Sequence, residues 1–381
     1  MNARKSLLSI AVLVAMSGAA VADNGTVNTT QDGARNALTV DQSFATGSKT
    51  TINQVGTQNR SDVEQTGRRN TASVNQASGA AATDDVQQAA KLNQGGRDNT
   101  ASIYQEGTTA NKVTATINQG LNGGSYNTAG INQVAGRGNA QALINQGGEN
   151  NTGLINQNKT IAGSATLTQG GISNTGTINQ YDSYMGESVK LTQTGYSNKG
   201  TIAQTDTDFK NASITQSGGF NVANVEQSNA NFGSADITQN ALFSDASAYQ
   251  RSGNNMNATI NQTGLNNSAT TDQAGHHHTA TVKQLGADNG LVSVTQRGNS
   301  QKAEVTQTWG SGNVAYVNQS GAYNEEALLQ SGYNNTATIT QTGTAAAGYA
   351  NTVSLTQSGN LQSATVSQSG GASNSAVIVQ R

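Results

Sequence analysis

The polar and apolar residues of this chain alternate in short stretches. In residues 70–76, Asn, Ala, Val and Gln occupy every second position, and Thr, Ser and Asn fill the positions between them. Successive side chains of a β-strand point to opposite faces, so this period of two predicts a half-buried strand. The pattern recurs in residues 99–105, 221–227, 313–319 and 335–341. Outside the first 22 residues no apolar residues recur at the spacing of three and four that a helix needs.

Each predicted strand ends in a glutamine, and these glutamines recur along almost the whole chain. Thirty of them lie between Gln31 and Gln380, and 23 of the 29 steps between them are 11 or 12 residues. Two steps form a strand-turn-strand unit of about 23 residues, which cannot bury its own inner face and must stack on copies of itself. We therefore predict an all-β fold, a β-solenoid of about fifteen stacked repeats with cross-β character.

The segment between two strands usually reads Gln-x-Gly-x-x-Asn. Glycine supplies the positive φ of a tight reversal, and the asparagine amide can cap the turn. We predict turn glycines at nine of these positions: Gly56, Gly67, Gly96, Gly195, Gly218, Gly264, Gly286, Gly321 and Gly332.

Stacked copies place identical side chains above one another. Each inner amide can then bond to its copies on both sides, so that buried polar groups stay paired. We predict this structural stacking ladder at Gln54, Asn59, Gln65, Asn70, Gln76, Gln94, Asn99, Gln105, Gln193, Asn198, Gln204, Gln216, Asn221, Gln227, Gln319, Gln330, Asn335 and Gln341.

The composition supports an interior built from amides. Hydrophobic residues are 34% of the chain, aromatic residues 4% and charged residues 11%, which is too little for a thick apolar core or for disorder driven by charge. Proline, which would interrupt a strand ladder, is absent, and so is cysteine. The net charge of −2 argues against a nucleic-acid partner, and we expect no cofactor.

The first residues form a separate segment. Arg4 and Lys5 precede an apolar stretch that ends near residue 16, and Ala20-Val21-Ala22 fits a cleavage site. We predict a secretory signal peptide at residues 1–22, a short N-terminal segment at 23–30 and the repeat solenoid at 31–381. Residues 77–91 and 342–350 break the repeat, and the steps between glutamines are longer from residue 105 to residue 146. We expect lengthened turns in these three stretches.

The consensus resembles the curlin repeat, as residues 65–76 and 330–341 show. The resemblance implies a secreted subunit of curli fibres, the functional amyloid of the Gram-negative biofilm matrix, for adhesion and aggregation. It implies identical subunits, a nucleator subunit, an outer-membrane secretion pore and host or abiotic surfaces as partners. The last predicted strand, residues 374–380, continues the repeat without a charged cap, which favours polymerisation.

Other functions compete with this interpretation. The chain could be a minor, nucleating curlin at the cell surface. It could also be a monomeric solenoid that binds ice or carbohydrate through outward threonines such as Thr71, Thr116 and Thr338, although other residues interrupt these arrays. A carbohydrate-cleaving enzyme is disfavoured because inward carboxylates do not cluster.

Two features depart from the repeat. His276, His277 and His278 are adjacent, and because neighbouring residues of an extended segment point in different directions, we expect a solvated turn there rather than a metal site. All the histidines lie in this turn, and no base is set against a nucleophile, so we expect no enzymatic activity. The alternation also turns Glu326 inward, which predicts either a local shift or a weak point.

Overall fold

The computed structural model describes residues 24–78, 88–107, 112–121, 123–136, 138–184, 186–344 and 348–381. These residues form parallel strands stacked into a β-solenoid of about 15 turns, and none of them is helical. Accordingly, the described chain contains no apolar helix of membrane-spanning length. The predicted signal peptide at residues 1–22 lies outside the described residues. The chain divides into two compact units, residues 1–171 with 180–182, and residues 172–179 with 183–381.

The first unit consists of two parallel sheets, and each turn of the solenoid contributes one strand to each sheet. One sheet pairs β1 with β4, β7, β9, β11 and β13 in succession, and the other pairs β2 with β5, β8, β10, β12 and β14. The strands of this unit are β1 (Thr26–Ala34), β2 (Ala37–Asp41), β3 (Ala45–Thr46), β4 (Lys49–Thr57), β5 (Asn59–Gln65), β6 (Gly67–Arg68), β7 (Thr71–Ala77), β8 (Gln88–Gln94), β9 (Thr100–Glu106), β10 (Val113–Gln119), β11 (Thr128–Val134), β12 (Gln141–Gln146), β13 (Thr152–Asn158) and β14 (Ser164–Gln169).

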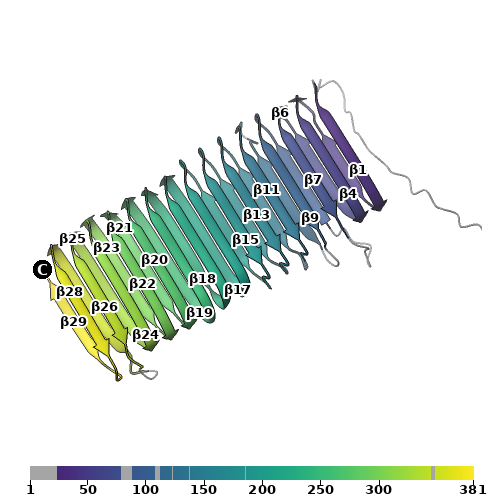
Figure 1. Cartoon of the computed structure of the whole chain (residues 1–381). Coiled ribbons are helices and arrows are strands. Elements are labelled where there is room, and N and C mark those ends of the chain that lie inside the picture. Colours follow the sequence, from purple (N-terminus) through teal and green to yellow (C-terminus); the bar gives the residue numbers. More distant parts are fainter. Residues whose placement is uncertain are drawn as a thin grey trace, which may run out of the picture. The chain divides into compact units, whose positions relative to one another are not determined.

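The second unit repeats this arrangement, and β15 (Thr175–Tyr181) is divided between the units. β17, β18 and β19 each continue around a turn, so one long strand contributes to both sheets (Figure 1). The strands of this unit are β16 (Ser188–Gln193), β17 (Lys199–Gly219), β18 (Val222–Leu242), β19 (Asp245–Leu265), β20 (Ser268–His276), β21 (Thr279–Asp288), β22 (Leu291–Asn299), β23 (Lys302–Ser311), β24 (Val314–Ala322), β25 (Asn324–Tyr333), β26 (Thr336–Thr342), β27 (Asn351–Asn360), β28 (Ser363–Ser369) and β29 (Ser375–Gln380).

Burial follows the alternation in the sequence. In β7, Ala72, Val74 and Gln76 are buried, and the residues between them are at least partly exposed. Strands pair with neighbours of the same kind, so Val74 meets Ile52 and Ile103 in the adjacent turns. The apolar core of each unit is therefore a thin layer of stacked Ala, Ile, Val and Leu columns between its two sheets.

The turns bend through left-handed backbone. The nine predicted turn glycines have positive φ angles between 63° and 107°. A Cβ on Gly332 would lie 1.9 Å from the carbonyl oxygen of Gly359 in the next turn, and one on Gly218 would lie 2.1 Å from that of Ala241. Close stacking of the backbone therefore requires glycine there, in addition to the bend itself.

Two segment boundaries differ from the expected ones. The first strand begins at Thr26 rather than at Gln31, because residues 26–30 pair with residues 49–53 of β4. Residues 88–91 were expected in a lengthened turn, but they form the first half of β8 and pair with residues 59–62 of β5. Gln88 stacks on Asn59, so a glutamine there takes the place that asparagine has in the preceding turn.

Candidate functional site: the stacked amide ladders

The glutamines at the strand ends form hydrogen-bonded columns in each unit. In the first unit one column joins Gln31, Gln54, Gln76, Gln105, Gln133, Gln157 and Gln180, and its Nε2-to-Oε1 distances are 2.6 to 2.9 Å. The facing sheet carries a second column, which joins Gln42, Gln65, Gln94, Gln119, Gln146 and Gln169.

The second unit has the same two columns with more members. One column runs through Gln193, Gln216, Gln239, Gln262, Gln284, Gln307, Gln330, Gln357 and Gln380. The other runs through Gln204, Gln227, Gln250, Gln273, Gln296, Gln319, Gln341 and Gln368. In all four columns each Nε2 donates to the Oε1 of the next turn toward the C-terminus.

Gln330 shows how one rung is satisfied. Its Oε1 accepts from Nε2 of Gln307, and its own Nε2 donates to Oε1 of Gln357, both at 2.9 Å. The same Nε2 lies 3.0 Å from the backbone carbonyl oxygen of Val314 and 3.3 Å from that of Asn335. Gln330 is fully buried, so these bonds replace the ones its amide would make with water.

At one turn edge most turns have an asparagine that links its own turn to the next, although Ser244 and Gly290 occupy this position in two turns. Asn335 Nδ2 donates to the carbonyl oxygens of Ser331 in its own turn and Gly359 in the following turn, at 2.9 and 3.0 Å. Its Oδ1 accepts from the backbone N–H of Gln362 at 3.0 Å. One side chain therefore caps its own turn and ties it to the following turn.

All eighteen residues of the predicted ladder are buried, with at most 1% exposure. The structure places the glutamines among them in the four columns described above. Asn70, Asn99, Asn198, Asn221 and Asn335 lie at the turn edge just described, whereas Asn59 lies at the opposite edge. The asparagines of the predicted ladder therefore lie at both turn edges.

The opposite turn edge is less regular, although Asn324, Asn351 and Asn374 stack there in the last turns. In the second unit, four consecutive turns have Glu187, Lys210, Gly233 and Met256 at this position, as the register of the adjoining strands shows. Sequence reasoning missed this difference between the edges. The available signal was that the Gln-x-Gly-x-x-Asn motif follows mainly alternate glutamines.

Lys210 is a buried cation at that edge. Its Nζ donates to Oε1 of Gln250 at 3.0 Å, two turns along the solenoid, and Gly233 in the intervening turn has no side chain to obstruct it. Burial lowers the pKa of Lys210 to about 8. In the preceding turn Glu187 is also buried and accepts from Oγ1 of Thr207 at 2.6 Å.

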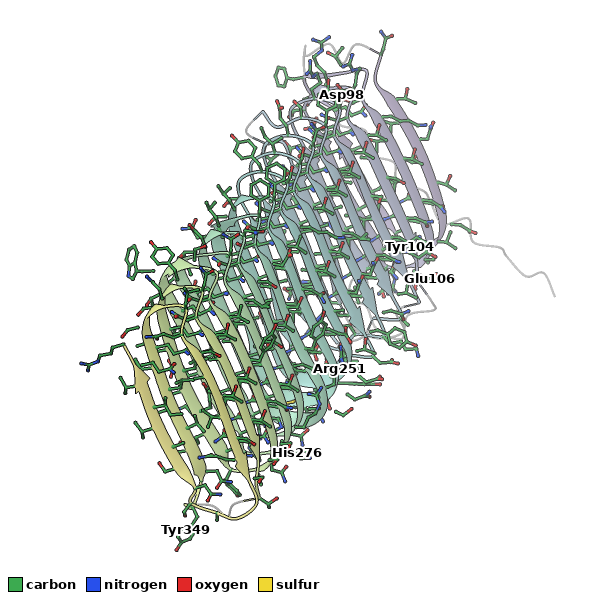
Figure 2. All side chains as sticks on the ribbon, turned by 60° about the vertical axis from the view of Figure 1, so that its left-hand side comes forward. Asp98, Tyr104, Glu106, Arg251, His276 and Tyr349 are labelled. Atoms are coloured by element: carbon green, nitrogen blue, oxygen red, sulfur yellow. The ribbon has the colours of Figure 1, made fainter. Side chains whose placement is uncertain are left out.

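The sequence suggested that all three histidines lie in a solvated turn, but the structure places only two of them there. His276 and His277 are exposed at the turn edge, where Figure 2 labels His276, but His278 is fully buried. Nε2 of His278 lies 3.0 Å from the carbonyl oxygen of Ala274, so the imidazole takes the place that an asparagine amide has in other turns. Burial lowers the pKa of His278. Within the described ranges no three His, Cys, Asp or Glu side chains are grouped to hold a metal ion.

This geometry defines a class of protein, a parallel β-solenoid whose turns are joined by in-register amide ladders. The family model of the curlin associated repeat matches residues 46–77 and 348–381, and these matches support assigning the chain to the curlin family. No curated protein matches the chain. The matches and the fold together support a curli-like structural subunit in general. The curlin repeat family is structural and non-enzymatic, and it implies an extracellular fibre at the bacterial cell surface.

Proposed function

We propose that the chain is secreted and assembles end to end into curli-like amyloid fibres of the biofilm matrix, for adhesion and aggregation. The observation that carries this proposal is the continuity of the glutamine ladders. Every rung between the ends of a column both accepts from one neighbouring rung and donates to the other, so each turn is a template for a further turn of the same sequence pattern.

The first and last strands that the structure describes support this mechanism. β1 pairs with β4 along one edge and β29 pairs with β27, and no strand of the described residues pairs with their other edges. Such edges expose backbone donors and acceptors to which an extended chain can add. An incoming copy that continues the register would also extend the glutamine columns.

The proposal includes the route and the partners. Residues 1–22 direct export and are removed, and the assembling solenoid extends from β1, which begins at Thr26, to residue 381. The partners are identical subunits, a nucleator subunit, an outer-membrane secretion pore, and host or abiotic surfaces. Mass spectrometry of protein recovered outside the cell tests the cleavage: a retained leader would contradict the first of these statements.

Assembly is tested with mature protein diluted from denaturant. We expect thioflavin T fluorescence to rise after a lag and the product to give a meridional reflection at ~4.7 Å, the spacing of hydrogen-bonded strands. A trace of preformed fibre should shorten the lag. Protein that stays monodisperse, without this reflection, would refute assembly, and an unshortened lag would refute growth from the ends.

A pair of variants connects assembly to the ladder. Combined Gln330→Ala and Asn335→Ala removes two buried amides and should slow assembly. Thr336→Ala changes an exposed side chain on the adjacent residue and should leave the rate unchanged. Equal rates for the two variants would contradict a role of the ladder in assembly.

A further inference from the structure

Glu326 places a carboxyl group in the core of the second unit, where the neighbouring turns have small or apolar side chains. It pairs in register with Ala303 of β23 and with Val353 of β27. Glu326 is 3% exposed, and these two neighbours are 1% and 3% exposed. The strand has not shifted to avoid burying the carboxyl, because Gln330 still pairs with Gln307.

The buried carboxyl is not compensated by hydrogen bonds. In the part of the chain that the structure describes, neither oxygen of Glu326 has a partner in full hydrogen-bonding geometry. The backbone N–H of Glu304 lies near enough to favour the ionised form, but burial outweighs this single donor. An ionised carboxylate needs several donors or a cation when water is removed from it. Consistent with this environment, burial raises the pKa of Glu326 well above its ordinary value of 4.5.

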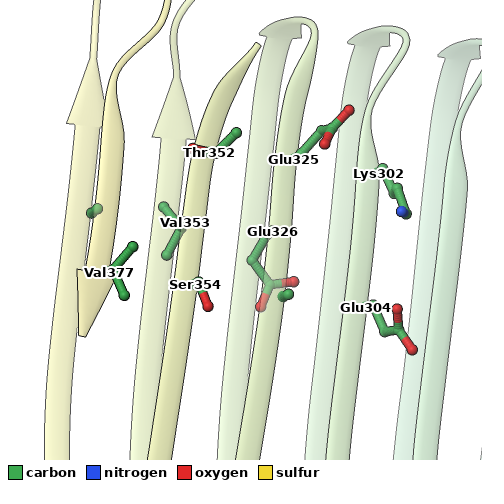
Figure 3. A pocket seen from close by; sticks show the side chains of 10 residues that line it. Lys302, Glu304, Glu325, Glu326, Thr352, Val353, Ser354 and Val377 are labelled. Atoms are coloured by element: carbon green, nitrogen blue, oxygen red, sulfur yellow. The ribbon is translucent and has the colours of Figure 1, made fainter. Parts of the chain in front are cut away.

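The charged groups nearby do not neutralise Glu326. Figure 3 shows Lys302 and Glu304 on β23 and Glu325 on the same strand as Glu326. Glu304 is engaged by Lys283, at 2.9 Å, and its carboxylate repels a charge on Glu326. The described part of β27 has only neutral side chains, and the opposing β24 and β26 contribute one titratable group, Tyr316, which is 44% exposed.

We propose that Glu326 makes closure of the solenoid around β25 a proton-coupled step. The strand enters the stack with a neutral carboxylic acid, and at higher pH this part of the solenoid opens so that the carboxylate can be hydrated. The inference concerns folding within one chain and does not depend on the proposed assembly.

The direction of the pH effect follows from linkage. The folded chain binds this proton more tightly than the unfolded chain, so the stability from a neutral Glu326 is fully present below pH 4.5 and falls as the pH rises toward the raised value. In that window the ratio of closed to open β25 decreases by up to about tenfold for each pH unit.

The test is amide hydrogen exchange in β25 and β27 at several pH values, with each variant compared with the wild type at the same pH. Glu326→Ala places alanine in register with Ala303, the residue at the same position of the preceding turn. Glu325→Ala is the matched control, because it removes an exposed carboxylate one residue away. We expect the wild type and the control to lose protection progressively above pH 4.5, and Glu326→Ala to stay about tenfold or more better protected at pH 7.

The same pH slope in the wild type and Glu326→Ala would overturn the inference. If Glu326→Ala does not fold, Glu326→Gln, which has similar shape and no charge, must also abolish the slope, and a retained slope refutes the proposal. Thioflavin T is recorded separately. Protection that depends on Glu326 in a chain that never forms fibres would support this inference and refute the assembly proposal.

Discussion

Replacing Gln216 by alanine removes one complete rung from a ladder in the second unit. Gln216 accepts from Nε2 of Gln193 at 2.8 Å and donates to Oε1 of Gln239 at 2.9 Å. Its Nε2 also lies 3.1 Å from the carbonyl oxygens of Lys199 and Asn221. Gln193 keeps backbone acceptors in Thr175 and Asn198, so the main polar loss falls on Gln239, whose Oε1 loses this donor.

The magnitude follows from these contacts. A buried acceptor without its donor costs about 1–3 kcal/mol, and the space left by the side chain adds to this. We therefore expect Gln216→Ala to destabilise the unit by about 2–4 kcal/mol, or roughly a hundredfold in the folding equilibrium.

The assay is guanidinium denaturation followed by the β-sheet circular dichroism signal. Thr215→Ala, at the adjacent exposed position of the same strand, is the control and should change the free energy of unfolding by less than about 0.5 kcal/mol. Gln216→Met fills a similar volume without hydrogen-bonding groups, so it should lose nearly as much stability as alanine. If methionine restores wild-type stability, packing accounts for the column and the ladder reasoning is wrong.

Two further predictions concern a turn and a buried cation. Gly332→Ala should lower the free energy of unfolding by more than about 2 kcal/mol, because φ is +98° and the added Cβ would lie 1.9 Å from a backbone oxygen. Gly147→Ala is the control and should cost under about 1 kcal/mol, because the described residues leave open space around Gly147. Equal denaturation midpoints for the two variants would contradict the steric argument. For Lys210, whose pKa is lowered to about 8, folding releases a proton between pH 8 and the ordinary value of 10.5, so stability should increase with pH across that window by up to about 3 kcal/mol. Lys210→Met should remove this increase, and an unchanged slope in the denaturation midpoints would show that another group titrates.

Much of the fold could be predicted because the sequence repeats its constraints. The alternation before each glutamine specifies a strand with one buried face, and a unit of about 23 residues must stack to cover that face. The stacking ladder set was selected on the same grounds, since a buried amide needs a partner in each adjacent turn. Even the inward direction of Glu326 follows from counting back two and four residues from Leu328 and Gln330.

The second turn edge could not be predicted in this way. Lys210 is buried because Gly233, 23 residues later, leaves room and Gln250 supplies an acceptor, and neither condition is visible in the residues around Lys210. His278 looks like part of a polar turn, yet it takes the place of a buried amide. The burial of Lys210 and His278 depends on the particular residues in neighbouring turns, whereas the regular positions follow a sequence pattern that recurs in every turn.

The common direction of the glutamine bonds has a consequence for how copies can join. In each column every carboxamide dipole points the same way along the stack, so one end of the column offers Oε1 acceptors and the other offers Nε2 donors. A head-to-tail junction would continue each column, whereas a head-to-head junction would bring oxygen against oxygen. A fibre built from such units would therefore be polar, with two chemically different tips that elongate at different rates.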